Sequence, residues 1–177
     1  MKLIILDRDG VINHDSDAYI KSPEEWRALP GSLEALARLS QAGFRVVVAT
    51  NQAGVARGLF DLATLGAIHT KMHQAVIQAG GRIEAIFFCP HSPDAGCDCR
   101  KPKPGMLVEI FKRFKVAPRE VFAVGDSLRD LHAAEAAGCV PVLVLTGKGK
   151  ATLEQGALPA ATRVRADLAA VAAELAP

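Results

Sequence analysis

Aromatic side chains are scarce in this sequence of 177 residues: they make up 5% of it, with one tryptophan and one tyrosine. There is no run of five like charges and the net charge is +2, so neither a nucleic acid nor a membrane surface is favoured as a partner. The apolar run after Lys2 ends after four residues, too short for the core of a secretory signal. No stretch reaches the roughly 18 apolar residues of a membrane span. We therefore expect a cytoplasmic protein.

Small apolar residues are what the sequence has in abundance. Half of the chain is hydrophobic, with alanine, valine and leucine prominent. The length suits one domain that can bury most of its apolar surface, and no repeat or linker divides it. This composition is typical of small-residue helices that cover a sheet. We predict a single α/β domain over residues 1–177.

Strand-like and helix-like segments alternate along the chain. Apolar, β-branched runs predict strands, and segments with helical periodicity lie between them. Ser32 and Asp61 are predicted to cap the first two helices. The alternation predicts a doubly wound parallel sheet with right-handed crossovers. The predicted strands cover residues 3–6, 45–49, 83–88, 121–124 and 140–145, with a weak strand near residue 164.

Polar residues stand where three of these strands end. Asp7 and Asp9 follow the first strand, Thr50 and Asn51 the second, and Asp126 the fourth. Ligands of open α/β sheets bind outside the carboxyl ends of the strands. Two close carboxylates repel each other, and a divalent cation relieves that repulsion. An Asp-x-Asp-Gly run alone favours a plain turn, so the prediction of a site depends on the residues at the other strand ends.

These residue types suit phosphoryl transfer. One carboxylate can attack phosphorus and form an acyl phosphate, while a second acid protonates the departing alkoxide. Magnesium prefers hard oxygen ligands, and the transferred group needs positive and hydrogen-bonding partners, which Thr50 and Lys101 can supply. The sequence has neither a Ser-His-Asp order nor a phosphate-cradling Gly-x-x-x-x-Gly-Lys loop.

Taken in order, the motifs resemble those of the haloacid dehalogenase superfamily of phosphatases. They are Asp7-x-Asp9-Gly10, Thr50-Asn51, Lys101 and Gly125-Asp126. The resemblance implies a Rossmann-like fold without a large cap domain, with Asp7 as nucleophile and Asp9 as general acid and base. It implies that Asp7, the main-chain carbonyl of Asp9 and Asp126 hold Mg²⁺. It also implies that Thr50 and Lys101 stabilise the phosphoryl group.

Three of the four cysteines lie within eleven residues, with a histidine among them. Without an export signal, such crowding favours a metal over disulfides, and free thiols are the alternative. Four protein ligands leave zinc no open position, so we predict a structural zinc that braces this loop. The predicted zinc ligands are Cys89, His91, Cys97 and Cys99.

Three other residues of metal-binding type receive a structural interpretation. Cys139 stands alone before a predicted strand, as a small core residue would. His69 and His73 are one helical turn apart without an acidic companion. We interpret both as exposed helix residues, not as metal ligands.

The cysteine-rich loop beside Cys99-Arg100-Lys101-Pro102 narrows the resemblance to the branch of heptose bisphosphate and histidinol-phosphate phosphatases. The irregular segment 11–29 is then either a substrate-contacting flap or a plain surface loop. Ser127 stands where some members carry a lysine, and the loop between His91 and Cys97 is short. The predicted substrate-contacting residues are Asp15, Tyr19, Thr50, Asn51, Gln52, Ala53, Arg100, Lys101 and Ser127.

From this resemblance we expect a Mg²⁺-dependent phosphatase that removes the phosphate at carbon seven of a heptose 1,7-bisphosphate through an aspartyl phosphate. Such a reaction belongs to lipopolysaccharide core biosynthesis. A histidinol-phosphate phosphatase and a catalytically dead, zinc-braced binding module remain alternatives. Arg100 favours a bisphosphate, because its planar fork binds a second phosphate bidentately. Without a large cap, we expect a small phosphorylated sugar as substrate and a monomer.

Overall fold

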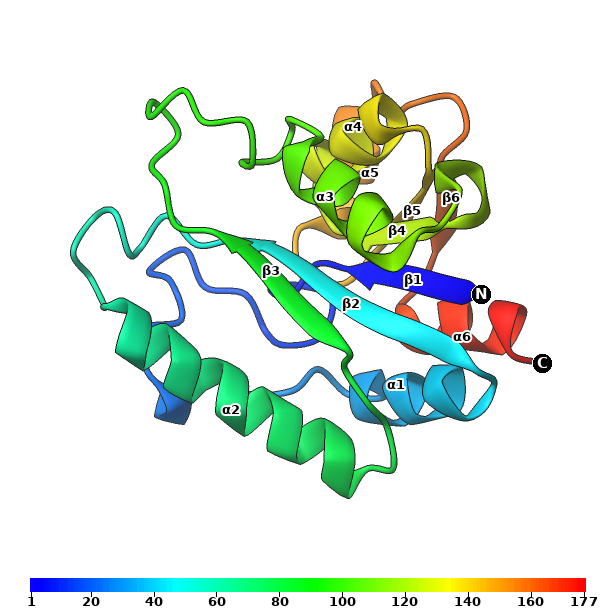
Figure 1. The fold of residues 1–177 in the computed structure, drawn as a ribbon, viewed down its shortest axis with the longest axis horizontal. Coiled ribbons are helices and arrows are strands. Elements are labelled where there is room, and N and C mark those ends of the chain that lie inside the picture. The colour runs from blue at the N-terminus through cyan, green and yellow to red at the C-terminus, as the bar shows by residue number, and fades with distance from the viewer.

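Six parallel strands form the only sheet of the computed structural model, which describes residues 1–177 (Figure 1). Their spatial order is β3-β2-β1-β4-β5-β6, and every neighbouring pair is parallel. The predicted doubly wound sheet is therefore confirmed. The strands are β1 (Lys2–Leu6), β2 (Phe44–Asn51), β3 (Ala85–Cys89), β4 (Phe122–Gly125), β5 (Val140–Val144) and β6 (Arg163–Arg165).

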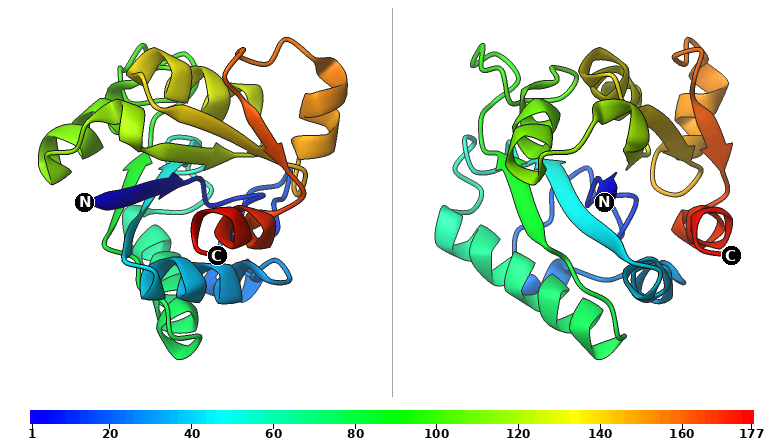
Figure 2. Two further views of the ribbon diagram at one scale, coloured as in Figure 1. Left: turned by 90° about the vertical axis from the view of Figure 1, so that its right-hand side faces the viewer. Right: turned by 45° about the vertical axis from the view of Figure 1, so that its right-hand side comes forward.

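Helices cover both faces of this sheet, and no large cap domain is inserted between them. One layer consists of α1 (Ser32–Gln41), α2 (Leu62–Gln78) and α6 (Leu168–Leu175), and α6 lies beside α1 (Figure 2). The other contains α3 (Gly105–Phe114) and α4 (Leu128–Ala137), while α5 (Gly149–Gln155) follows β5. Two short 3₁₀ turns, η1 (Pro23–Glu25) and η2 (Pro118–Glu120), complete the elements.

None of these helices is both long enough and apolar enough to cross a bilayer.

The apolar run of β1 is explained by its burial on both faces. Ile4 and Leu6 belong to the core under α1, α2 and α6, whereas Leu3 and Ile5 belong to the core under α3 and α4. All four side chains are at most 2% exposed. A strand with a helix layer on each side needs apolar residues at every position, so its sequence shows no alternation.

The order in which the chain adds strands reverses between β1 and β4. From β1 the chain proceeds outward to β2 and β3, and from β4 it proceeds outward on the other side to β5 and β6. Ligands of such sheets bind at this switch point, outside the carboxyl ends of the strands. Asp7 directly follows β1, where its N–H donates to the Val124 carbonyl at 2.9 Å, and Asp126 directly follows β4.

Of the two predicted helix caps, the one at Asp61 is confirmed and the one at Ser32 is wrong. Asp61 caps α2 by accepting a hydrogen bond from the Thr64 N–H at 2.7 Å. Ser32 instead is the first residue of α1, preceded by Gly31 in the left-handed conformation with φ of 76°. The Ser32 hydroxyl donates to the Ile12 carbonyl at 2.7 Å, so it ties the segment after β1 to α1.

Candidate active site

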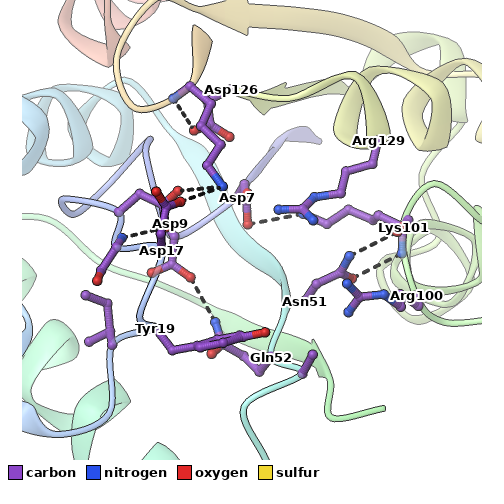
Figure 3. Close-up of a pocket in the computed structure, with 15 residues that line it drawn as sticks. Asp7, Asp9, Asp17, Tyr19, Asn51, Gln52, Arg100, Lys101, Asp126 and Arg129 are labelled. Atoms are coloured by element: carbon purple, nitrogen blue, oxygen red, sulfur yellow. Dashed lines mark hydrogen bonds and ion pairs between the residues drawn. The ribbon is translucent and has the colours of Figure 1, made fainter. Parts of the chain in front are cut away.

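A polar pocket lies outside the carboxyl ends of the central strands. Five aspartates and four basic residues are among the 15 residues that line it. Figure 3 shows the carboxylates of Asp9 and Asp17 on one side and Lys101, Arg100 and Arg129 on the other, with Asp7 between them. The predicted site residues that line this pocket are Asp7, Asp9, Asp15, Tyr19, Asn51, Gln52, Ala53, Arg100, Lys101 and Asp126.

Asp7 is held by one of its two carboxylate oxygens. Its Oδ1 accepts the Arg8 main-chain N–H at 2.8 Å and lies 3.1 Å from Lys101 Nζ. Burial raises the pKa of Asp7 to about 7, against the opposing effect of Lys101 and with added repulsion from the Asp130 and Asp9 carboxylates. Since these contacts occupy Oδ1, the Oδ2 atom is the one available to an incoming group.

Lys101 reaches Asp7 because three acceptors surround its ammonium group. Besides Asp7, its Nζ lies 2.7 Å from Asp130 Oδ1 and donates to the Ala49 carbonyl at 2.8 Å. Burial acts to lower the pKa of Lys101, but the Asp130 and Asp7 carboxylates outweigh burial and raise it. The ammonium therefore stays charged beside Asp7, where it can stabilise negative charge on a phosphoryl group.

Asp9 has a different environment. Its Oδ1 accepts hydrogen bonds from Arg8 Nη2 at 2.8 Å, Arg8 Nε at 3.1 Å and Asn13 Nδ2 at 2.9 Å. Its Oδ2 accepts from Gln52 Nε2 at 3.1 Å. Burial acts to raise the pKa of Asp9, but Arg8 and the hydrogen bonds outweigh it and lower the pKa. The pKa of Asp7 is therefore raised and that of Asp9 is lowered, although the two residues are only two positions apart. Such a difference is expected of two carboxyl groups with separate chemical roles.

The carboxylates of Asp7, Asp126 and Asp130 offer oxygen atoms within 4.8 Å of one another. Asp130 is already engaged, since Lys101 approaches its Oδ1 and the Ser127 N–H and hydroxyl donate to its Oδ2 at 3.1 and 2.7 Å. Burial, with repulsion from Asp7 and Asp130, raises the pKa of Asp126 to about 8. Buried, mutually repelling carboxylates fit a divalent cation with oxygen ligands, which would relieve this repulsion.

Two glycines let the chain close around Asp126. Gly10 has a φ of 81° and Gly147 a φ of 55°, and a Cβ atom on either would overlap Asp126 Oδ2. The glycine of the Asp-x-Asp-Gly motif is therefore required by close approach and by backbone conformation. A side chain at position 10 would displace Asp126 from the cluster that it forms with Asp7 and Asp130.

The cysteine-rich loop connects β3 to α3, and its four predicted ligands converge. Cys89 Sγ lies 3.7 Å from Cys97 Sγ, while His91 Nδ1 lies 3.5 Å from Cys89 Sγ and 3.3 Å from Cys99 Sγ. Tetrahedral zinc with ordinary bond lengths would separate such ligand atoms by about 3.6–3.8 Å. The donor set and its spacing therefore fit zinc.

Two predicted substrate-contacting residues do not line the pocket. Thr50 is buried and accepts a hydrogen bond from Gln52 Nε2 at 2.9 Å. Ser127 precedes α4 and forms a capping box with Asp130. Their contacts with a substrate therefore stay predictions.

Two further residues shape the pocket although neither was predicted from the sequence. Arg129 lines it from the first turn of α4, two positions after Ser127, and this closeness to the Gly-Asp motif was the available signal. Lys148 follows β5, and its Nζ lies 3.5 Å from Asp15 and 3.4 Å from Asp17. No motif marks Lys148, because its role depends on where a distant loop lies.

The interpretation of His69 as an exposed helix residue is wrong. Its side chain is 7% exposed and faces inward from α2 beside Ile68 and Met72. Its Nε2 lies 3.2 Å from Arg8 Nη1. His73, one turn further along, is half-buried. The inward-facing stripe of α2 is wider than its sequence suggested, because a polar histidine is accommodated there by a buried arginine. Cys139, in contrast, is a buried core residue as predicted.

Comparison with known proteins places this site in a family. Residues 98–171 match the HAD-hydrolase-like family model. A protein of Bordetella bronchiseptica named D-glycero-beta-D-manno-heptose-1,7-bisphosphate 7-phosphatase is 66% identical over 175 residues, 99% of this chain and 98% of the relative. The protein of the same name from Pseudomonas putida is 58% identical over 175 residues, 99% of each chain.

Solved structures agree with the sequence relatives. The crystal structure of D,D-heptose 1,7-bisphosphate phosphatase from B. bronchiseptica, complexed with magnesium and phosphate, has a TM-score of 0.98 at 66% identity and covers 99% of this chain and 98% of its own. The corresponding enzyme from Burkholderia thailandensis has a TM-score of 0.80 at 54% identity, with 99% and 98% covered. The chain therefore belongs to the haloacid dehalogenase-like phosphatases, in the group of proteins that carry the heptose bisphosphatase name.

Proposed function

We propose that this protein is a Mg²⁺-dependent phosphatase that removes the phosphate at carbon seven of D-glycero-β-D-manno-heptose 1,7-bisphosphate. One observation carries the proposal: Asp7, Lys101 and Asp126 converge at the switch point of a fold that matches a magnesium- and phosphate-bound heptose bisphosphatase at a TM-score of 0.98. Such an enzyme serves the synthesis of the lipopolysaccharide core. Histidinol-phosphate phosphatase is not favoured, since the close relatives bear the heptose bisphosphatase name.

In the first step, the free Oδ2 of Asp7 attacks the phosphorus atom of the C7 phosphate. A bond forms between this oxygen and phosphorus, and the bond between phosphorus and the C7 oxygen breaks. Asp9 gives its proton to the departing oxygen, so that the sugar leaves as an alcohol. Lys101, 3.1 Å from the other oxygen of Asp7, offsets the charge on the transferred group.

In the second step, water attacks the phosphorus atom of the aspartyl phosphate. Asp9 takes a proton from that water, the bond between Asp7 and phosphorus breaks, and inorganic phosphate leaves. The lowered pKa of Asp9 keeps its carboxylate ionised, which is the form that accepts a proton. The negative charge of a bound phosphate raises the pKa of a neighbouring carboxyl, which favours the protonated form that the first step needs.

We propose that Asp7, Asp126 and the main-chain carbonyl of Asp9 hold the catalytic Mg²⁺. When bound, this ion supplies charge that offsets the phosphate oxygens and the two carboxylates of raised pKa. The zinc is proposed to be structural, because four protein ligands leave it no open position. Arg100 directly follows Cys99, so the zinc-bound loop would fix where this arginine enters the pocket.

The second phosphate of the substrate is assigned to two guanidinium groups. Arg100 and Arg129 both line the pocket beside Lys101, on the side away from Asp9. Two planar guanidinium groups can bind a phosphate through paired hydrogen bonds, and Lys101 is already committed to Asp7 and Asp130. The proposed contacts with the sugar are Asp15, Tyr19, Asn51, Gln52 and Ala53, to which the predictions add Thr50 and Ser127.

We further propose that the protein acts as a monomer in the cytoplasm. The groups proposed for the chemistry, Asp7, Lys101 and Asp126, lie together within one chain, so the proposed reaction uses no residue of a second copy. Closely spaced free cysteines that serve as metal ligands are typical of a reducing compartment.

The proposal is tested by measuring kcat/KM with Mg²⁺ on the heptose 1,7-bisphosphate and on histidinol phosphate, with ³¹P NMR to show which phosphate leaves. We expect rapid loss of the C7 phosphate and slow turnover of histidinol phosphate. A higher kcat/KM on histidinol phosphate, or release of the C1 phosphate, would contradict the proposed substrate. No turnover of any phosphate ester would favour the dead binding module.

A further inference from the structure

Arg8, between the two catalytic aspartates, is the largest fully buried side chain of the protein. Its exposed fraction is 0%, and it is absent from the pocket lining that contains Asp7 and Asp9. Burial of a guanidinium requires partners for its N–H groups. Two sets of partners are present, one on each side: the Asp9 carboxylate and the ring of His69.

The two oxygens of the Asp9 carboxylate differ in how many hydrogen bonds they accept. Nε and Nη2 both donate to Asp9 Oδ1, which also accepts from Asn13, so three donors saturate this oxygen. Asp9 Oδ2 accepts only from Gln52, at 3.1 Å. Oδ2 is therefore the oxygen that can exchange a proton with the leaving group and with water.

The remaining contact of Arg8 runs to α2. Nη1 lies 3.2 Å from His69 Nε2, across 61 residues of sequence. Burial, with the positive charge of Arg8, lowers the pKa of His69 to about 3, so the ring is neutral. Because arginine can only donate, Nε2 of this neutral ring is the acceptor and the ring proton is on Nδ1.

We propose that His69 is a positioning residue for catalysis: as a neutral acceptor it fixes the guanidinium plane of Arg8, which in turn aims Asp9 Oδ2 at the reacting oxygen. The proposal rests on the proposed function, which makes Asp9 the acid and base. His69 touches neither substrate nor metal ligand, so it acts only through Arg8. A side chain that accepts a hydrogen bond at the Nε2 position, such as glutamine, should replace it, whereas an apolar one should not.

The alternative is that His69 merely satisfies a buried arginine. Hydrolysis of 4-nitrophenyl phosphate separates the two roles, because nitrophenolate leaves without help from an acid. Formation of the aspartyl phosphate from this ester therefore does not need Asp9, while its hydrolysis does. Damage to the fold reduces both phases together, whereas a misaimed Asp9 slows only the second.

The experiment compares the rapid first release of 4-nitrophenol with the steady-state rate, in the presence of Mg²⁺, for wild type, His69→Leu and His69→Gln. In His69→Leu we expect the first release to persist while the steady-state rate falls about tenfold, part of the roughly hundredfold or more that acid–base catalysis supplies. His69→Gln should regain most of the steady-state rate. His73→Leu, one turn further along α2, is the matched control and should behave as wild type.

An unchanged ratio of the two phases in His69→Leu would overturn the proposal, as would His69→Gln that is no better than His69→Leu. If His69→Leu does not fold, His69→Phe replaces it, because phenylalanine fills the space of the imidazole ring but offers no hydrogen-bond acceptor. The same ratio of the two phases is then measured. Wild-type protein that turns over neither 4-nitrophenyl phosphate nor the heptose bisphosphate would instead overturn the proposed function, so the two failures are distinguishable.

Discussion

The aspartate site and the cysteine–histidine loop are two clusters of potential metal ligands that the fold holds in different ways. Asp7 and Asp126 follow buried strands of the central sheet, and main-chain N–H groups and Lys101 fix their carboxylates. Cys97 and Cys99 lie on a loop without regular structure, between β3 and α3. The sheet positions the aspartate cluster. No strand or helix positions Cys97 and Cys99, so their arrangement is expected to depend on a bound metal.

This difference separates what each metal is expected to do. Removing a cation from the aspartate site would leave the sheet folded and would mainly take away chemistry. If the cysteine–histidine loop holds the proposed zinc, removing that ion would take away the link that orders the loop, and with it the position of Arg100.

Asp7→Asn should abolish activity without loss of fold. An amide cannot form the acyl phosphate, so turnover should fall to background. Because burial raises the pKa of Asp7 to about 7, its ionised carboxylate opposes folding of the metal-free protein at pH 8, and the amide removes that effect. Activity is measured with Mg²⁺, and Tm in a buffer that lacks Mg²⁺ but contains no chelator. Substantial turnover would contradict the role of Asp7 as nucleophile, and a Tm well below that of wild type would contradict the prediction that the fold survives.

Metal removal should separate the two clusters. Depletion of Mg²⁺ alone should stop turnover and leave the protein folded, with a smaller fall in Tm than zinc depletion causes, because the ion offsets the Asp7 and Asp126 charges but does not hold the chain together. Depletion of zinc, of which we expect about one per chain, should lower Tm and activity together, because four ligands close the site. Elemental analysis, thermal unfolding and rate measurements check this, with each metal restored as the control. Zinc-free protein with full activity and an unchanged Tm would show that the loop needs no metal.

Arg100→Ala should weaken recognition of the second phosphate. Loss of a hydrogen bond to a charged group is expected to reduce transition-state binding by roughly 1.5–3 kcal/mol, seen in kcat/KM on the bisphosphate. A monophosphate substrate lacks the contact and should be affected little. Arg82→Ala, at an exposed position before β3, is the matched control. An equal loss on both substrates would assign Arg100 to the reacting phosphate instead.

Cys139→Ala should have the smallest effect. This thiol is buried, away from the cluster, and its Sγ donates to the Ala134 carbonyl at 3.4 Å. Its truncation is expected to lower the free energy of unfolding by about 1 kcal/mol, as for an ordinary core substitution. Zinc content and activity should not change, whereas Cys97→Ala should lose the metal. Zinc loss on Cys139→Ala would mean that the cluster is not confined to the loop.

The fold could be predicted because its signals are local. Apolar runs such as that of β1 are buried on both faces, and polar residues at the strand ends mark the edge where ligands bind. Asp7, Asp9 and Asp126 were found in this way, since strand ends converge in any parallel sheet. The start of α1 was misjudged, because Ser32 bonds to Ile12 instead of capping its own helix.

Contacts between distant segments could not be predicted. His69 contacts Arg8, and Lys148 contacts Asp15. No sequence spacing or motif predicts either contact. Periodicity placed His69 on a helix but did not reveal that a buried guanidinium would accommodate a polar ring there. The positions of His69 and Lys148 relative to the site therefore follow from how α2 and the loop after β5 pack, which the sequence alone does not show.

The most direct measurement of the central claim is a rapid quench of wild-type enzyme with the heptose bisphosphate and Mg²⁺, followed by mass spectrometry of the peptide that contains Asp7. We predict one phosphoryl group on Asp7, formed and lost at rates that account for turnover. Turnover that proceeds while Asp7 stays unmodified, or with the phosphoryl group on another residue, would contradict the account.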